Sequence, residues 1–140
     1  LFRSRDVYEM REEEMAGIKK ESFRLFYGGG ELWIEHLDGI HEATDAAILK
    51  LREDYARLKR PSMPGAVAVN LEGTRVNAPL ITEIARLFMS GEKRITRVAF
   101  VGVGRAEKKA LKKALSKSGF VIAFREDFEK AKEWLLSGGS

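Results

Sequence analysis

The stretch RVAFVGVGRAEKKALKKALSKSGFVIAFRED, residues 97–127, decides the fold of this chain. An apolar run leads into Gly102, a lysine-rich run with helical spacing follows, and a second apolar run ends in acidic residues. This pattern predicts a strand, a helix and a second strand. The two strands are expected to be parallel, because the helix returns the chain to the end of the sheet where the first strand began.

The glycines of this stretch have the outline of a dinucleotide-binding motif. Gly102 and Gly104 match its first two glycines. The third position holds Glu107, whose side chain would crowd the helix against the strand and bring negative charge near a phosphate. Glu126 stands near the place of a ribose-binding acid, but only one more helix follows, so a nucleotide-binding half cannot be completed. We interpret the glycines as a tight turn, with an anion held by Arg105 as the weaker alternative.

The rest of the domain continues the alternation of strands and helices. Two alternating runs flank the glycines at 28–30 and predict a hairpin. Helical spacing at 44–59, 77–91 and 127–136 and an apolar run at 65–71 complete the order β-β-α-β-α-β-α-β-α. This order predicts an α/β fold with a mixed, mostly parallel five-stranded sheet. The continuous apolar runs of the last three strands predict helices on both faces.

Local signals predict where the helices begin and which side they bury. Thr44 or Asp45 is expected to cap the first crossover helix, and Asn77 the second. In the third helix, Ala110 and Leu111 are expected to face the core.

The length of 140 residues predicts one domain. We assign it to residues 22–137. Residues 1–21 are expected to be an N-terminal extension, either helical from Asp6 onward or left over from an expression tag, and residues 138–140 a flexible tail.

Composition narrows the classes of function. The absence of cysteine excludes disulfides and thiolate metal sites and fits a cytoplasmic protein. No apolar run reaches the roughly 20 residues that span a bilayer. A net charge of +4 is a small excess, which disfavours nucleic acid as the main partner. His36 and His41 lack the spacing of a metal site, and we expect no metal and no cofactor.

Five lysines fall on neighbouring rows of the third helix and give it one positive face. We interpret this face as the solvated side of an amphipathic helix, and an acidic partner, anionic lipid or RNA are the alternatives. No aromatic residue interleaves with the lysines, as base stacking would require. The five are Lys108, Lys109, Lys112, Lys113 and Lys117.

The order of elements and three segments resemble the STAS domain, and within it the stage II sporulation protein AA-like group, which is also grouped with Sec14-like lipid carriers. The segments are KRITRVAFVGV (93–103), FVIAFRE (120–126) and DFEKAKEWLL (127–136). The resemblance covers roughly residues 22–137 and consists of hydrophobic patterns. It implies a non-enzymatic regulatory or protein-interaction module, like an anti-sigma-factor antagonist. A carrier or binding domain for a small lipid or anionic, nucleotide-like ligand is the alternative.

In the antagonist branch, a serine that follows an aspartate at the start of the second crossover helix is phosphorylated. Asn77 and Ala78 stand at these positions, so the acceptor hydroxyl is missing. Thr74, in the preceding loop, is a weaker candidate acceptor, and an ordinary turn residue is the favoured interpretation.

Polar residues that follow the second parallel strand form the predicted binding region, with the glycine turn as its neighbour. Open α/β sheets bind ligands beyond the carboxyl ends of their strands. We expect a protein partner there, and leave open a small apolar or anionic ligand and a homodimer. No catalytic residue is assigned. The predicted residues are Asn70, Glu72, Thr74, Arg75, Asn77, Gly102, Gly104 and Arg105.

Overall fold

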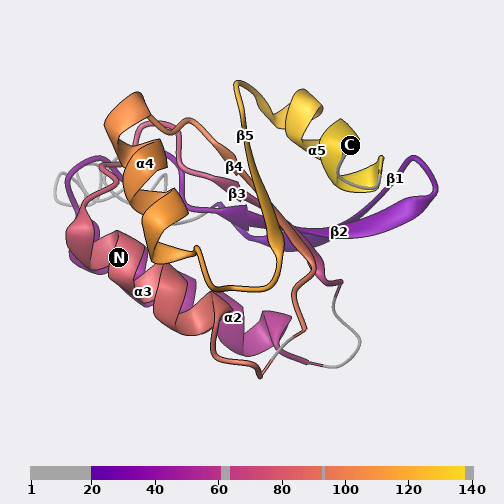
Figure 1. The fold of residues 1–140 in the computed structure, drawn as a ribbon, viewed down its shortest axis with the longest axis horizontal. Coiled ribbons are helices and arrows are strands. Elements are labelled where there is room, and N and C mark those ends of the chain that lie inside the picture. The colour runs from indigo at the N-terminus through magenta and orange to yellow at the C-terminus, as the bar shows by residue number, and fades with distance from the viewer. Residues whose placement is uncertain (1–19, 61–63, 93, 138–140) are drawn as a thin grey trace, which may run out of the picture.

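The computed structural model describes residues 20–60, 64–92 and 94–137, which form a sheet with helices on both faces (Figure 1). Apart from Lys20 and Glu21, the predicted extension lies outside the described residues, as does the predicted tail at 138–140. The elements in chain order are β1 (Phe23–Tyr27), β2 (Gly30–His36), α2 (Thr44–Leu58), β3 (Ala66–Asn70), α3 (Ala78–Phe88), β4 (Arg97–Val101), α4 (Arg105–Ala114), β5 (Val121–Arg125) and α5 (Phe128–Leu136).

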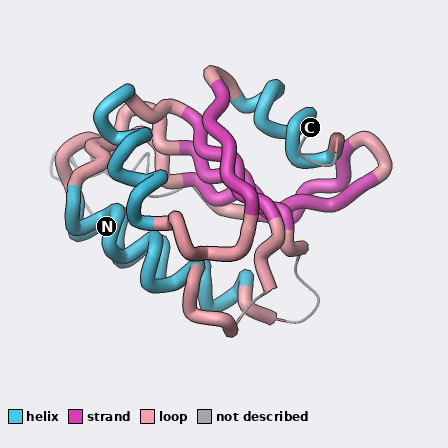
Figure 2. The backbone as a smooth tube through the Cα atoms, in the orientation of Figure 1, coloured by secondary structure: helices cyan, strands magenta, loops and turns pink. Residues whose placement is uncertain are grey.

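The five strands lie in the order β1-β2-β3-β4-β5, so each strand pairs with its neighbour in sequence (Figure 2). β1 and β2 are antiparallel across the turn at Gly28 and Gly29, which both have positive φ. The later pairs are parallel, with Val67 opposite Val98 and Phe100 opposite Phe124. The predicted mixed, mostly parallel sheet is therefore confirmed.

Helices α2, α3 and α4 cover one face of the sheet, and α5 covers the other (Figure 1). Alternation along each strand divides the side chains between the two faces. In β2, Trp33 belongs to the core cluster that includes residues of α2, α3 and α4, whereas Leu32 and Ile34 belong to the cluster that includes Trp134 of α5. All of these side chains are buried. Within the described residues, no helix combines the length and the apolar character needed to cross a membrane.

The prediction that the last three strands are covered on both faces is wrong for β5. β3 and β4 are buried, but β5 is only half-buried and Val121 is 53% exposed. The reason is position, since β5 lies at the edge of the sheet and has a strand on one side only. Ala110 is also exposed, because α4 turns only a narrow stripe that includes Leu111 toward the core.

The cap of α2 also differs from the prediction. Ala43 precedes the helix, and neither Thr44 nor Asp45 caps it. The Thr44 hydroxyl instead accepts a hydrogen bond from Nδ2 of Asn77, at 2.8 Å. Asn77 caps α3 as predicted, because its Oδ1 accepts from the Leu80 amide at 3.3 Å. The Asn77 side chain thus caps α3 and also hydrogen-bonds to the first residue of α2.

The turn between β4 and α4 requires glycine for two reasons. Gly102 has φ +81°, which L side chains rarely adopt. A Cβ at this position would also lie 2.7 Å from the backbone of Glu72. The glycine therefore serves close packing between two loops.

We predict that Gly102→Ala lowers the free energy of unfolding by about 3 kcal/mol, since backbone strain and overpacking add. Gly119→Ala is the matched control, because Gly119 has φ +87° but open space around its Cβ position. It should cost only about 1 kcal/mol. Urea unfolding of both variants measures the difference, and equal losses would contradict the contact with Glu72.

Candidate functional site

The polar residues at the end of β3 and in the loop after it are held by the protein's own backbone. Asn70 Oδ1 accepts from the Glu72 amide at 3.1 Å. The Thr74 hydroxyl donates to the Leu37 carbonyl at 2.5 Å and accepts from the Ile40 amide at 3.0 Å. These bonds fasten the loop after β3 to the loop after β2. The hydroxyl of Thr74 is therefore occupied rather than presented to solvent.

The other predicted residues of this loop have structural roles or face solvent. Arg75 forms an exposed ion pair with Glu42 at 3.0 Å, and Asn77 caps α3. Glu72 is exposed, and its backbone lies against Gly102. The structure thus brings the two predicted segments together where Glu72 lies against Gly102.

Gly102 and Gly104 line an open hollow of about 710 Å³ at the carboxyl end of β5. Its charged lining is of both signs, from Lys108, Arg125, Glu126 and Lys130. Arg105, by contrast, is exposed at the start of α4 and does not line the hollow. Of the predicted site residues, only the two glycines face this space.

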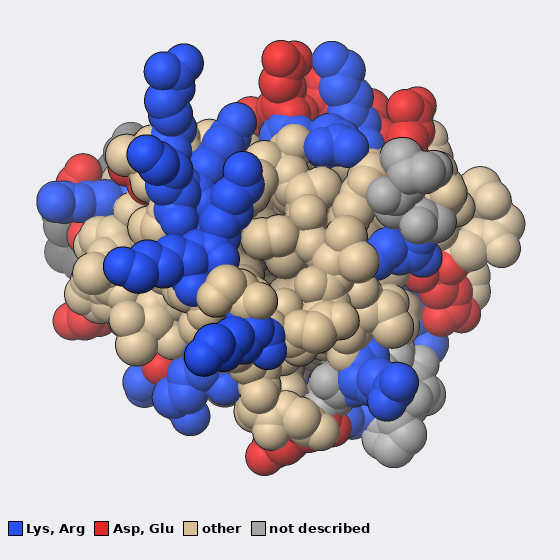
Figure 3. Space-filling model, viewed as in Figure 1, with Lys and Arg blue, Asp and Glu red and all other residues tan. Residues whose placement is uncertain are grey.

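A cationic surface covers the outer side of α4 and its C-terminal end. We call it the α4 basic surface, and Figure 3 shows its side chains gathered over the helix. All six of its cations are exposed, and within the described part of the chain none forms an ion pair. They are Arg105, Lys108, Lys109, Lys112, Lys113 and Lys117.

Two of these lysines reach beyond the helix toward the edge strand. The ammonium groups of Lys108 and Lys112 each lie 5.9 Å from the centre of the Phe124 ring in β5. This distance is within the range of cation–π attraction. The α4 basic surface and the β5 edge therefore form one continuous region.

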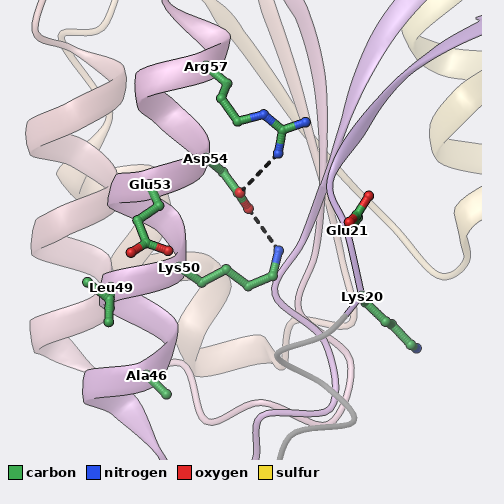
Figure 4. A pocket seen from close by; sticks show the side chains of 8 residues that line it. All are labelled: Lys20, Glu21, Ala46, Leu49, Lys50, Glu53, Asp54 and Arg57. Atoms are coloured by element: carbon green, nitrogen blue, oxygen red, sulfur yellow. Dashed lines mark hydrogen bonds and ion pairs between the residues drawn. The ribbon is translucent and has the colours of Figure 1, made fainter.

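Sequence reasoning missed a buried polar cluster between α2 and β2. Lys50 donates to Asp54 at 2.8 Å, and Ser22 donates to the same carboxylate at 2.7 Å. Figure 4 shows Lys50 and Arg57 approaching Asp54 from two sides. Glu35 completes the cluster, and its Oε1 accepts from the indole of Trp33 at 2.9 Å. Lys50 and Asp54 also line an open cavity of about 320 Å³.

Burial raises the pKa of Glu35 well above its ordinary value, and the nearby Asp54 raises it further. Burial also acts to raise the pKa of Asp54, but hydrogen bonds from Glu35, Lys50 and Ser22 outweigh it and lower this pKa. Of the two carboxyls, Glu35 is therefore the one that favours the proton, and we predict that it donates to Asp54. Such a proton would give a role to Glu35 Oε2, which is buried and has no hydrogen-bond partner among the described residues.

Two signals in the sequence could have revealed this cluster. Glu35 has the same parity along β2 as the buried Trp33, so strand alternation directs both inward. Lys50 and Asp54 are four residues apart, on the face of α2 that also carries Leu51 and Leu58. Among the described residues, no group of three or more acidic or histidine side chains is arranged to hold a metal.

We predict that Glu35→Gln changes the free energy of unfolding by less than about 1 kcal/mol at neutral pH, since an amide reproduces the protonated acid. Asp54→Asn should cost about 3 kcal/mol, because it leaves Lys50 buried without its counter-charge. Chemical denaturation measures both. A larger loss in Glu35→Gln than in Asp54→Asn would contradict the assignment.

The raised pKa of Glu35 also predicts a dependence on pH. Its contribution to stability is complete below the ordinary glutamate pKa and is lost as pH rises through the raised value. Stability should therefore decline in the parent chain as pH rises from the ordinary glutamate pKa to the raised value, and decline less over that window in Glu35→Gln. Parallel declines in a series of denaturation curves against pH would rule out a protonated Glu35.

We predict that Thr74→Val lowers the free energy of unfolding by about 1–3 kcal/mol, because the Ile40 amide loses its acceptor. Thr74→Ser keeps the hydroxyl and should lose less than about 1 kcal/mol. Thermal unfolding compares the two variants. If Thr74→Val were as stable as the parent chain, the hydroxyl would not hold the two loops together.

No protein-family model matches the chain, and no curated protein matches it. Among solved structures, the chain is similar to an uncharacterized protein of the DUF3478 family from Shewanella loihica PV-4, described as having a SpoIIAA-like fold. The TM-score is 0.54 at 16% identity, and the match covers 82% of this chain and 92% of that chain. With its five-stranded mixed sheet and its helices on both faces, this chain has the SpoIIAA-like fold.

Proposed function

We propose that the chain is a STAS-like protein-interaction module that binds an acidic surface of a protein partner through the α4 basic surface. The observation that carries this proposal is the set of six exposed cations without ion pairs in the described part of the chain. Elsewhere in the described residues, most lysines and arginines form ion pairs. Unpaired like charges on one helix repel each other, and an acidic partner would relieve that repulsion.

The surroundings of α4 favour a protein over a membrane or RNA. Leu111 is buried, and the exposed apolar residues of the helix are the alanines at 106 and 110, which offer little to insert into a bilayer. Phe124, the nearby aromatic ring, is half-buried with lysines over it, so it offers no open face for base stacking.

The start of α3 supports a mode of action without phosphorylation at the position used in antagonists. The helix begins at Ala78, which has no hydroxyl, and the Asn77 side chain occupies the cap position. Thr74 is already bonded twice to the neighbouring loop. In this proposal, partner binding is therefore governed by charge on α4 rather than by a phosphate at α3.

Carriage of a small ligand between the helices and the sheet has weaker support. Large side chains fill the interface there, and Trp33, Leu51 and Phe100 are almost completely buried. The hollow beside Asp54 and the hollow beside Gly102 both open at the surface and are lined by charges of both signs. A ligand retained in native mass spectrometry would favour the carrier.

A charge-neutralising variant tests the interaction module. Lys108→Gln, Lys112→Gln and Lys113→Gln together should weaken binding of a labelled oligoglutamate peptide about tenfold, since each lost pair is worth roughly 0.5 kcal/mol. Fluorescence anisotropy at low and high salt measures the affinity for the peptide. High salt should also weaken binding of the peptide by the parent chain.

The control removes three exposed cations that lie away from α4, one of which, Lys59, pairs with Glu92: Lys59→Gln, Arg60→Gln and Arg94→Gln. It should bind within about threefold of the parent. Equal losses in the two triple variants would mean that only net charge matters. Tighter binding to RNA or to vesicles containing phosphatidylserine than to the peptide would reject a protein partner.

A further inference from the structure

We infer that the bound segment of the partner is an extended acidic strand that pairs with the free edge of β5 beneath the α4 basic surface. The inference rests on the proposed function, because the same lysines would attract the partner. It adds that the backbone of β5 sets the register of the bound partner segment and the specificity for that segment. Pairing with an exposed sheet edge is a common way to bind an extended peptide.

β5 presents unpaired backbone groups on its outer side. It pairs with β4 on one side, and no described strand lies on the other. The Val121 amide donates to the Thr96 carbonyl on the β4 side, at 3.1 Å. Because neighbouring residues of a strand point their N–H and C=O groups to opposite sides, those of Ile122 and Phe124 point outward.

The β5 edge has few of the features that usually block strand addition. Sheet edges are commonly protected by proline, lysine or a bulge. The first four residues of β5, Val121 to Phe124, are uncharged and contain no proline. One partial cover exists, since Arg125 Nη1 donates to its neighbour's carbonyl, that of Phe124, at 2.9 Å. Within the described ranges, no side chain bonds to the outward N–H and C=O of Ile122.

The two faces of the edge predict the sequence pattern of the partner. Ile122 and Phe124 pack on the side of α4, with Lys108 and Lys112 around the Phe124 ring. Val121 is exposed and Ala123 packs on the side of α5. Residues opposite one another on adjacent strands share a face. A matching segment therefore alternates acidic residues toward α4 with apolar residues beside Val121.

The charges oppose a second copy of this chain as the occupant of the β5 edge. Two copies that joined their β5 strands in a continuous sheet would place both α4 basic surfaces on the same face. Like charges at such a contact oppose association. The other edge strand, β1, lies beside α5, where Lys132 is paired with Glu129, so it has no comparable excess of free cations.

Three synthetic peptides test the inference against the full chain. The first alternates Glu and Val. The second has the same sequence, with N-methyl groups on the amides that would face β5. The third is the oligoglutamate peptide of the charge test. Fluorescence anisotropy gives the affinities. Amide hydrogen exchange measures the protection of the outward-facing amides of β5. The Ala123 amide, which faces β4, is the internal reference.

The alternating peptide should bind at least about tenfold more tightly than its N-methylated form, and it should slow exchange of the Ile122 amide but not of Ala123. Equal affinities of these two peptides, or unchanged exchange at Ile122 in the complex, would overturn strand addition and leave the charge-based proposal standing. If none of the three peptides bound, the proposed function would fail as well.

Discussion

The burial of β3 and β4 on both faces is the constraint on which the rest of the structure depends. Every residue of β3 is buried, and so are four of the five in β4. Their apolar side chains need cover above and below, which the three helices α2–α4 and the single helix α5 supply. With the centre of the sheet closed in this way, the free backbone is at the outer strands. β5 is therefore left half-exposed, and α4 lies at the margin of the core.

This arrangement separates the structural polar groups from those available to a partner. Thr74 and Asn77 hold loops and helix ends together. Glu35 and Asp54 share a buried network that ties α2 to β2. The lysines of α4 have neither role, because the single buried stripe of that helix turns its other sides to solvent. Unpaired charge and unpaired backbone thus meet at the same edge of the molecule.

Local signals in the sequence predicted the fold well. Turns, caps and buried strands depend on adjacent residues, so the local sequence predicts them. Examples are the turn at glycines 28–30, the cap at Asn77 and the apolar run of β4. The alternating order of the predicted strands and helices then indicated that helices connect parallel strands. The half-exposure of β5 could not be predicted, because the sequence alone left open the order of strands in the sheet.

The candidate site was predicted less well, for the same physical reason. That polar residues follow β3 is evident from the sequence, but the occupation of the Thr74 hydroxyl depends on the backbone of Leu37 and Ile40, far away in the chain. The pairing of Glu35 with Asp54 likewise arises only when α2 packs on β2. The lysines of α4 were visible in the sequence, whereas their lack of partners required the structure.

The most direct test of partner binding at α4 is a map of amide chemical shifts in the isotope-labelled chain as oligoglutamate is added. Binding there predicts shift changes concentrated in α4 and β5, around Lys108, Lys112 and Phe124. Changes centred on the start of α3, at Asn77 to Leu80, with α4 unaffected, would contradict it.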